Sequence, residues 1–219
     1  MRVRFVLVCE GSSDEGLVAH LQSICIERGA AEAIGLAPDF SRLPRAPSKD
    51  VKTRILAALA LEPSTNVVFV HRDADSRSEE PRINEIAEAS AGASVPVVPV
   101  VPIQETEAWL LLDEDAIRSV VENAHGTVSL GLPRPRDVEK LADPKEKLKE
   151  VLAVASGQQG RRLTRTKREF PRHRALLVER LDPGGKITLL SAWQRLLDRT
   201  GEAIQRLRDE ANRTGAIDP

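Results

Sequence analysis

The run that decides the fold is Asn66-Val67-Val68-Phe69-Val70-His71-Arg72-Asp73-Ala74-Asp75. Its first six residues are largely apolar and β-branched, which predicts a central strand of a sheet. A polar, acidic stretch follows at once, so the strand is expected to end in an acidic loop. In open α/β sheets, the loops at the carboxyl ends of the strands carry the functional residues.

The amino terminus repeats this pattern. Residues 3–8 are almost continuously apolar, which predicts a strand that is buried on both faces, as in a parallel sheet. Glu10-Gly11-Ser12-Ser13 predicts a turn, and Ser13 or Asp14 is expected to cap a helix that runs to about Arg28. Together these residues predict the first βα unit of a doubly wound fold.

Further strands are expected at 37–43 and 95–101, the second at a sheet edge because Pro96 and Pro99 cannot donate to a ladder. Strands alternate with helices up to about residue 105, and helices follow alone. We therefore expect an α/β fold with about four mostly parallel strands, flanking helices and a helical C-terminal part. The expected helices are 50–61, 81–91, 106–121, one that begins at Asp143-Pro144, 170–181 and 191–212.

The length, charge and cysteine content of the chain narrow the classes of protein to which it can belong. The chain has 219 residues, which predicts one or two domains, and we expect an α/β domain at 1–125 and a helical, basic region at 126–219. Its net charge of −1 does not by itself indicate a nucleic-acid partner. Cys9 and Cys25 lie in apolar runs and are expected to be reduced core residues. No signal peptide or membrane span is visible, so a cytoplasmic protein without membrane contact is expected.

Acidic residues follow two of the predicted strands. If these strands are parallel neighbours, Glu10, Asp73 and Asp75 meet at one edge of the sheet. Carboxylates gathered in this way stay ionised together only with cations among them, and oxygen ligands suit Mg²⁺ or Mn²⁺. Asp73 and Asp75 are expected to bind one ion, whereas Glu10 binds a second ion or transfers protons. The alternative is that Asp-x-Asp forms only a turn or a helix cap.

Two more carboxylates, Glu105 and Glu107, follow the last predicted strand. One interpretation is that one of them completes a site for two metal ions about 3.5–4 Å apart, which would stabilise the attacking and leaving oxygens of a phosphodiester. The other is that both are acids of a first helical turn, where the helix dipole favours them. Trp109 is expected to pack in the core.

Residues 157–180 carry eight basic against two acidic side chains, a net charge of +6, which leaves −7 for the rest of the chain. This asymmetry is typical of a basic segment that holds phosphates beside an acidic catalytic edge, and the alternative is a solvated helix face. His173 lies in this segment and is expected at the surface or facing a phosphate. The expected nucleic-acid-binding residues are Arg161, Arg162, Arg165, Lys167, Arg168, Arg172 and Arg174.

Three motifs resemble a known group of proteins. Glu10-Gly11-Ser12-Ser13-Asp14-Glu15 after the first strand and Asp73-Ala74-Asp75 after a later one are similar to TOPRIM domains, which occur in topoisomerases, primases and nucleases of the OLD (overcoming lysogenization defect) type. The run Pro102-Ile103-Gln104-Glu105-Thr106-Glu107-Ala108-Trp109-Leu110-Leu111 resembles the E-T-E-A-W-L signature of a bacterial TOPRIM-like group, domain of unknown function 4276. The resemblance extends from Val3 to the helix that contains Trp193.

The resemblance implies a Rossmann-like TOPRIM sheet with Glu10 as general acid/base and Asp73 and Asp75 as Mg²⁺ ligands. It also implies that Asp14 helps to hold a second metal. The expected function is metal-dependent cleavage of DNA or RNA, with anti-phage defence as the setting and an ATPase as partner. The alternative is a non-catalytic module that binds nucleic acid or docks on the ATPase, and a homodimer is compatible with either function.

Overall fold

The computed structural model describes residues 1–215 and contains an α/β fold. The backbone divides into two compact units. Within the described residues, unit 1 comprises 1–72, 80–101 and 194–215, and unit 2 comprises 73–79 and 102–193. This division differs from the expected boundary near residue 125, because the chain leaves unit 1 directly after a strand and returns to it with its last helix.

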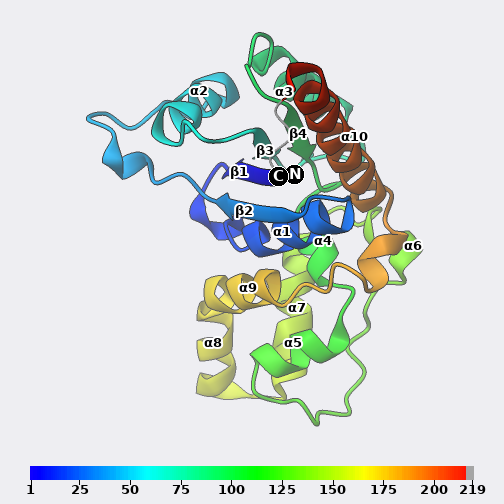
Figure 1. Ribbon diagram of the computed structural model, residues 1–219. Coiled ribbons are helices and arrows are strands. Elements are labelled where there is room, and N and C mark those ends of the chain that lie inside the picture. The colour runs from blue at the N-terminus through cyan, green and yellow to red at the C-terminus, as the bar shows by residue number, and fades with distance from the viewer. Residues whose placement is uncertain (216–219) are drawn as a thin grey trace. The chain divides into compact units, whose positions relative to one another are not determined.

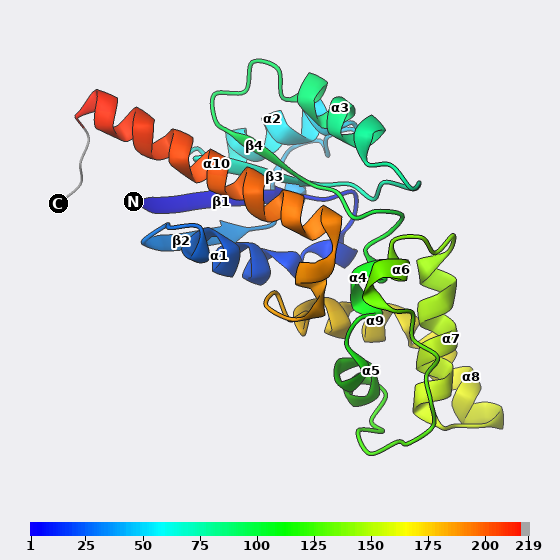
Figure 2. The ribbon, with the colours of Figure 1, turned by 90° about the vertical axis from the view of Figure 1, so that its right-hand side faces the viewer.

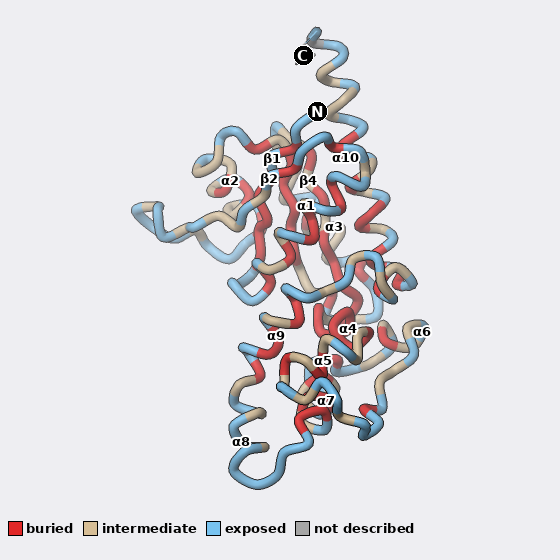
Figure 3. Tube along the Cα trace, turned by 60° about the horizontal axis from the view of Figure 1, so that its bottom comes forward, coloured by how far each residue is buried: buried red, intermediate tan, exposed pale blue. Residues whose placement is uncertain are grey.

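Unit 1 is built on a four-stranded, all-parallel sheet with the strand order β2-β1-β3-β4. The two inner strands supply most of its core, and Phe5 and Phe69 pack edge-on with their ring centroids 5.0 Å apart. Figure 3 shows these strands largely in the colour of buried residues. The strands are β1 (Arg2–Val8), β2 (Glu32–Leu36), β3 (Val67–His71) and β4 (Val97–Val100).

The sheet is covered on both faces, as expected for a doubly wound fold. In Figures 1 and 2, α1 (Leu17–Glu27) lies on one face, and α2 (Val51–Leu61) and α3 (Glu80–Ala89) lie on the other. The last helix, α10 (Ser191–Thr214), meets the end of α1, where Arg208 donates a hydrogen bond to the carbonyl of Gly29. Two 3-10 turns, Ser12–Asp14 and Phe40–Arg42, complete this unit.

The prediction of a strand at residues 37–43 was wrong. Residues 40–42 form a 3-10 turn that begins at Asp39, whose side chain accepts from the Ser41 N–H, and the strand lies earlier, at β2. Gly35 in β2 stands opposite Phe5 in β1, and a Cβ at Gly35 would overlap the phenyl ring. The absent side chain therefore lets this strand pair closely with β1.

Unit 2 is helical, and aspartate side chains cap the start of two of its helices. Asp113 accepts from the Ala116 N–H and starts a new helix, so the single helix expected at 106–121 is broken into two. Asp143 caps the helix at Pro144, as the sequence predicted. The helices are α4 (Glu107–Leu110), α5 (Glu114–Val120), α6 (Pro135–Val138), α7 (Pro144–Ser156), α8 (Gly160–Arg168) and α9 (Phe170–Glu179), with a 3-10 turn at Lys186–Leu189.

Two tryptophans mark the core of unit 2. Trp109 and Trp193 are each 1% exposed, and their rings pack edge-on with centroids 5.1 Å apart. Trp109 is therefore a core residue, as expected. None of the helices within residues 1–215 combines the length and the hydrophobicity of a membrane span.

Candidate functional site

The strand topology places the predicted acids after neighbouring strands. β1 and β3 run parallel side by side, with Val8 opposite Val70, and β4 flanks β3 on its other side. Glu10 follows β1 by two residues, and Asp73 follows β3 by two residues. Glu10 and Asp14 belong to unit 1, whereas Asp73, Asp75, Glu105 and Glu107 belong to unit 2.

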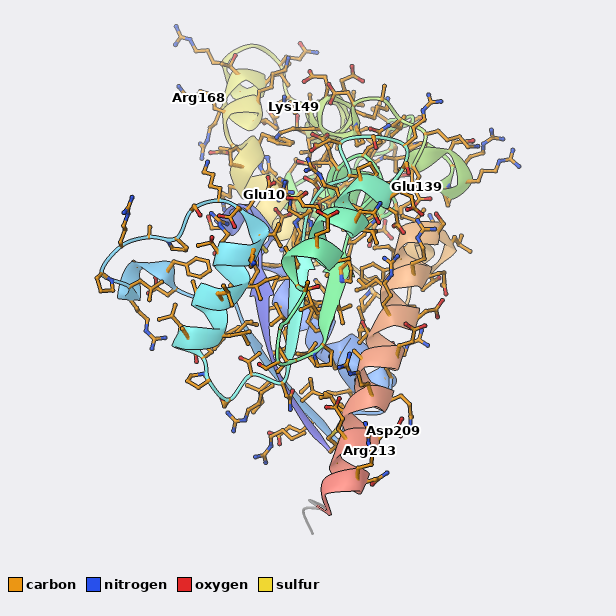
Figure 4. The ribbon with its side chains drawn as sticks, turned by 90° about the horizontal axis from the view of Figure 1, so that it is seen from above. Glu10, Glu139, Lys149, Arg168, Asp209 and Arg213 are labelled. Carbon is orange, nitrogen blue, oxygen red and sulfur yellow. The ribbon has the colours of Figure 1, made fainter. Side chains whose placement is uncertain are left out.

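In unit 1, Glu10 is held by an arginine that the sequence interpretation overlooked. The Glu10 side chain is 60% exposed and forms an ion pair with Arg72, whose Nη1 lies 2.6 Å from Oε1. Arg72 also lies 3.4 Å from Glu85 on α3. Arg54 donates to the carbonyls of Cys9 and Glu10 and so holds the backbone of this turn. Figure 4 shows Glu10 beyond the end of β1.

Asp14 and His71 form a second, buried group in unit 1. They are 7% and 2% exposed, and Nδ1 of His71 lies 4.0 Å from Oδ2 of Asp14. Ser13 donates to the same carboxylate oxygen at 2.8 Å. Asp14 therefore lies within the protein beside a histidine, and its predicted part in a second metal site stays a prediction.

In unit 2, the Asp-x-Asp segment is fixed by a short backbone ladder. The Ala74 N–H donates to the carbonyl of Pro102, the Asp75 N–H to that of Gln104, and the Gln104 N–H to that of Ser76. Asp75 and Gln104 have φ angles of 52° and 62°. Non-glycine residues are uncommon in this left-handed region, where they cost free energy and cluster at functional sites. The ladder therefore holds the aspartate loop in a conformation that an open loop would seldom adopt.

Carboxylates gather around this loop. Oδ1 of Asp73 accepts hydrogen bonds from the Thr106 N–H at 2.8 Å and from the Thr106 hydroxyl at 3.0 Å. Burial raises the pKa of Glu105, and the charges of Glu107 and Asp73 raise it further, against the N–H and charge of Lys145, which lower it. The charges of Asp73 and Glu107 thus act on Glu105 within one unit.

Glu107 has a strong structural partner. Its Oε1 accepts from Nε of Arg174 at 2.8 Å, and the two side chains are 3% and 9% exposed. The pair connects α4 to α9 in the interior of unit 2. Glu107 was a predicted metal ligand and Arg174 a predicted phosphate contact. A guanidinium buried in an ion pair is not presented to a phosphate, so we leave Arg174 out of the nucleic-acid surface proposed below.

The other predicted basic residues are exposed. They lie on α8 and at the start of α9, and Figure 4 shows Arg168 extending outward from α8. Arg165 is paired with Glu169, with Nε 2.8 Å from Oε1. We use the name basic surface for the exposed set Arg161, Arg162, Arg165, Lys167, Arg168 and Arg172.

A divalent ion was predicted at the acidic loop. Among residues 1–215, no group of three or more His, Cys, Asp or Glu side chains that could hold a metal ion is found. Mg²⁺ characteristically takes only one or two carboxylates and completes its shell with water and substrate phosphates. The carboxylate oxygens around Asp73 fit that coordination chemistry, and the repulsion felt by Glu105 is of the kind that a cation relieves.

Three residues that position these acids were missed by the sequence interpretation. Arg72 lies between the last residue of β3 and Asp73, and this position was the only feature of the sequence that pointed to a role for it. Thr106 lies inside the E-T-E-A-W run, but its contact with Asp73 spans 33 residues. Arg54 lies on α2 and reaches the Cys9 and Glu10 carbonyls across 45 and 44 residues, which no local pattern predicts.

Comparison of this chain with protein-family models, with curated proteins and with solved structures found no match.

Proposed function

We propose that this protein is a divalent-metal-dependent nuclease that cleaves phosphodiester bonds in DNA or RNA and is related to TOPRIM proteins. The observation that carries the proposal is the order of the sheet. Its adjacent parallel strands β1 and β3 are followed, each after two residues, by Glu10 and Asp73. Acids that follow the carboxyl ends of neighbouring parallel strands stand where α/β sheets carry their functional groups.

Asp73 and Asp75 are the residues that would hold the ion, with water and substrate phosphates completing its shell. Thr106 donates two hydrogen bonds to Oδ1 of Asp73, which fixes the direction of that carboxylate. The backbone ladder fixes Asp75. Hydrogen bonds of this kind keep metal-binding side chains oriented and raise the affinity of a site for its metal ion. Glu107 would act on the site through its charge, since Arg174 already occupies its carboxylate.

The ion, when bound, would neutralise charge on the phosphodiester and activate water as the nucleophile. Glu10 would accept or return the proton, since its exposed carboxylate is held in place by Arg72. The basic surface would bind the nucleic-acid backbone without selecting a sequence, because it offers guanidinium and ammonium groups to phosphates. These roles need only side chains that the chain already positions.

The test is cleavage of labelled single- and double-stranded DNA and RNA with Mg²⁺ or Mn²⁺. The key variant is Asp73→Asn, whose amide oxygen keeps an acceptor for Thr106 while the charge is lost. We expect it to lower the rate by at least about a hundredfold, since loss of metal-based charge stabilisation costs several kcal/mol. Asp198→Asn is the matched control, because this exposed residue of α10 makes the same change of charge elsewhere.

Equal cleavage by the wild type and Asp73→Asn would refute the proposal, as would activity that persists in excess chelator. Absence of cleavage under all conditions, together with metal-independent binding of nucleic acid, would instead favour a binding module that partners an ATPase. Circular dichroism of each variant shows whether a loss of rate reflects loss of fold.

A further inference from the structure

A cavity of about 460 Å³ in unit 2 is bounded by α7, α8 and the first residue of α9. Its volume is within the range of small-ligand sites, about 300–1,000 Å³. We call it the apolar cavity, because its walls include Leu152, Ala153 and Val154 of α7 and Phe170 of α9. The polar residues that line it are Glu146, Lys149, Glu150, Thr166 and Lys167. Apolar walls with a few polar groups are typical of sites for organic ligands.

The apolar wall is open to a ligand. Val154 is 44% exposed, although the neighbouring Val151 and Leu152 of the same helix are only 1% and 2% exposed. A ligand that covered Val154 would remove apolar surface from water, which is favourable.

The second cavity beside α8, of about 290 Å³, has a different lining. It includes Arg162, Arg165, Glu169 and Arg172, so a ligand there would meet charged groups. His173 also lines this second cavity but is 5% exposed, which corrects the expectation that it lies at the surface. A ligand with apolar faces therefore suits the apolar cavity and not the second one.

The charges around the apolar cavity leave a cation available to an anionic ligand. Glu146 accepts a hydrogen bond from Nζ of Lys149 at 2.9 Å. Glu150 is paired with Lys147, whose Nζ lies 3.6 Å from Oε2. Lys167 forms no ion pair with any residue in the described part of the chain. Lys167 also belongs to the basic surface, so the cavity and that surface are continuous.

We propose that the apolar cavity receives one base of a single-stranded nucleic acid whose backbone lies along the basic surface. The inference rests on the proposed function, because that function places a polynucleotide on α8. A nucleotide combines a base with apolar faces and an anionic phosphate, and the cavity combines an apolar wall with the unpaired ammonium of Lys167. In a duplex the bases are paired and stacked, so a base could enter only after it is flipped out at a cost in free energy. The favoured substrate class is therefore single-stranded DNA or RNA.

The test measures binding of fluorescently labelled strands to the full chain in excess chelator, so failure of the metal site does not affect it. A single-stranded oligothymidylate is compared with an abasic strand of equal length, which keeps every phosphodiester and lacks the bases. We expect the oligothymidylate to bind at least about fivefold more tightly, which is the lower end of the effect of contacts to one base.

Three variants separate the cavity from the basic surface. Val154→Gln places an amide in the apolar wall and should weaken binding of the oligothymidylate at least about fivefold, while binding of the abasic strand and of a duplex stays unchanged. Val128→Gln is the matched control, because Val128 is 61% exposed and does not line the cavity. Lys167→Gln should weaken binding of all three strands, because each of them presents phosphates to Lys167.

The inference is overturned if the oligothymidylate and the abasic strand bind equally, or if Val128→Gln weakens binding as much as Val154→Gln. Cleavage that depends on Asp73 would leave the nuclease proposal standing in either case. Conversely, base-dependent binding that is lost in Val154→Gln would support the cavity even if no cleavage is found. Absence of binding by every strand would overturn both the inference and the assignment of the basic surface to nucleic acid.

Discussion

Replacing Arg174 by methionine should destabilise unit 2 strongly, because it leaves the buried charge of Glu107 without its partner. The Nε to Oε1 distance is 2.8 Å, and the two side chains are 9% and 3% exposed. Water cannot replace the guanidinium at such low exposure. The bond joins residues 67 positions apart, so its loss also removes a direct link between α9 and α4.

The magnitude follows from the burial. Removing one member of a buried ion pair costs about 3–5 kcal/mol, a large part of a total stability of roughly 5–15 kcal/mol. The double variant Glu107→Leu/Arg174→Met removes both charges and keeps apolar volume. Replacements of that kind are often neutral or stabilising. The double variant should therefore be more stable than Arg174→Met.

The assay is equilibrium unfolding in urea, followed by circular dichroism and by tryptophan fluorescence. Both tryptophans are buried, so their emission reports on the packing near the pair. Arg172→Met is the matched control, because Arg172 lies two residues earlier and is exposed. A free energy of unfolding for Arg174→Met within about 1 kcal/mol of the wild type would refute the reasoning, since exposed pairs contribute no more than that. A double variant less stable than Arg174→Met would refute it too.

Two further predictions concern titrating groups. Burial raises the pKa of the Cys25 thiol from 9.0 to about 12. In a Cys9→Ser variant, where Cys25 is the remaining thiol, we therefore expect a disulfide reagent at pH 8 to react only after urea unfolds the chain. Rapid reaction of the native protein would contradict this prediction. Burial lowers the pKa of His173 below 6.5 despite the charge of Glu169. Above pH 6.5 the His173 ring is neutral in both the folded and the unfolded protein. Below pH 6.5 the unfolded chain binds a proton at His173 that the folded chain does not bind, so the free energy of unfolding falls. Between pH 7.5 and 5.5 the free energy of unfolding should fall less in His173→Gln than in the wild type, and equal losses would show that His173 does not contribute.

The parts of the fold that local pattern determines were predictable. β3 and β1 follow from apolar, β-branched runs, and the start of α7 follows from Asp143 and a proline. β2 was missed because its residues, Glu-Ala-Ile-Gly-Leu, look unlike a buried strand. Gly35 lets it pair closely with β1, because it leaves room for the ring of Phe5.

The candidate site was predictable to a similar extent. The order of the predicted elements indicated which acids follow adjacent strands, so Glu10 and Asp73 could be named from the sequence. The side chains that hold these acids in place could not be predicted from the sequence. Thr106 meets Asp73, and Arg174 meets Glu107, across 33 and 67 residues, and such contacts depend on tertiary packing. An arginine in a basic run looks the same in sequence whether it is exposed or buried, so the run alone could not set Arg174 apart.

The central claim is that the loop containing Asp73 binds a divalent cation, and Mn²⁺ binding followed by electron paramagnetic resonance tests it most directly. Bound Mn²⁺ loses the sharp signal of the free ion, so the assay needs neither substrate nor catalysis. We expect the wild type and Asp198→Asn to quench the signal alike, and Asp73→Asn to raise the dissociation constant at least about tenfold. Equal quenching by the wild type and Asp73→Asn, or no quenching by either, would contradict the claim.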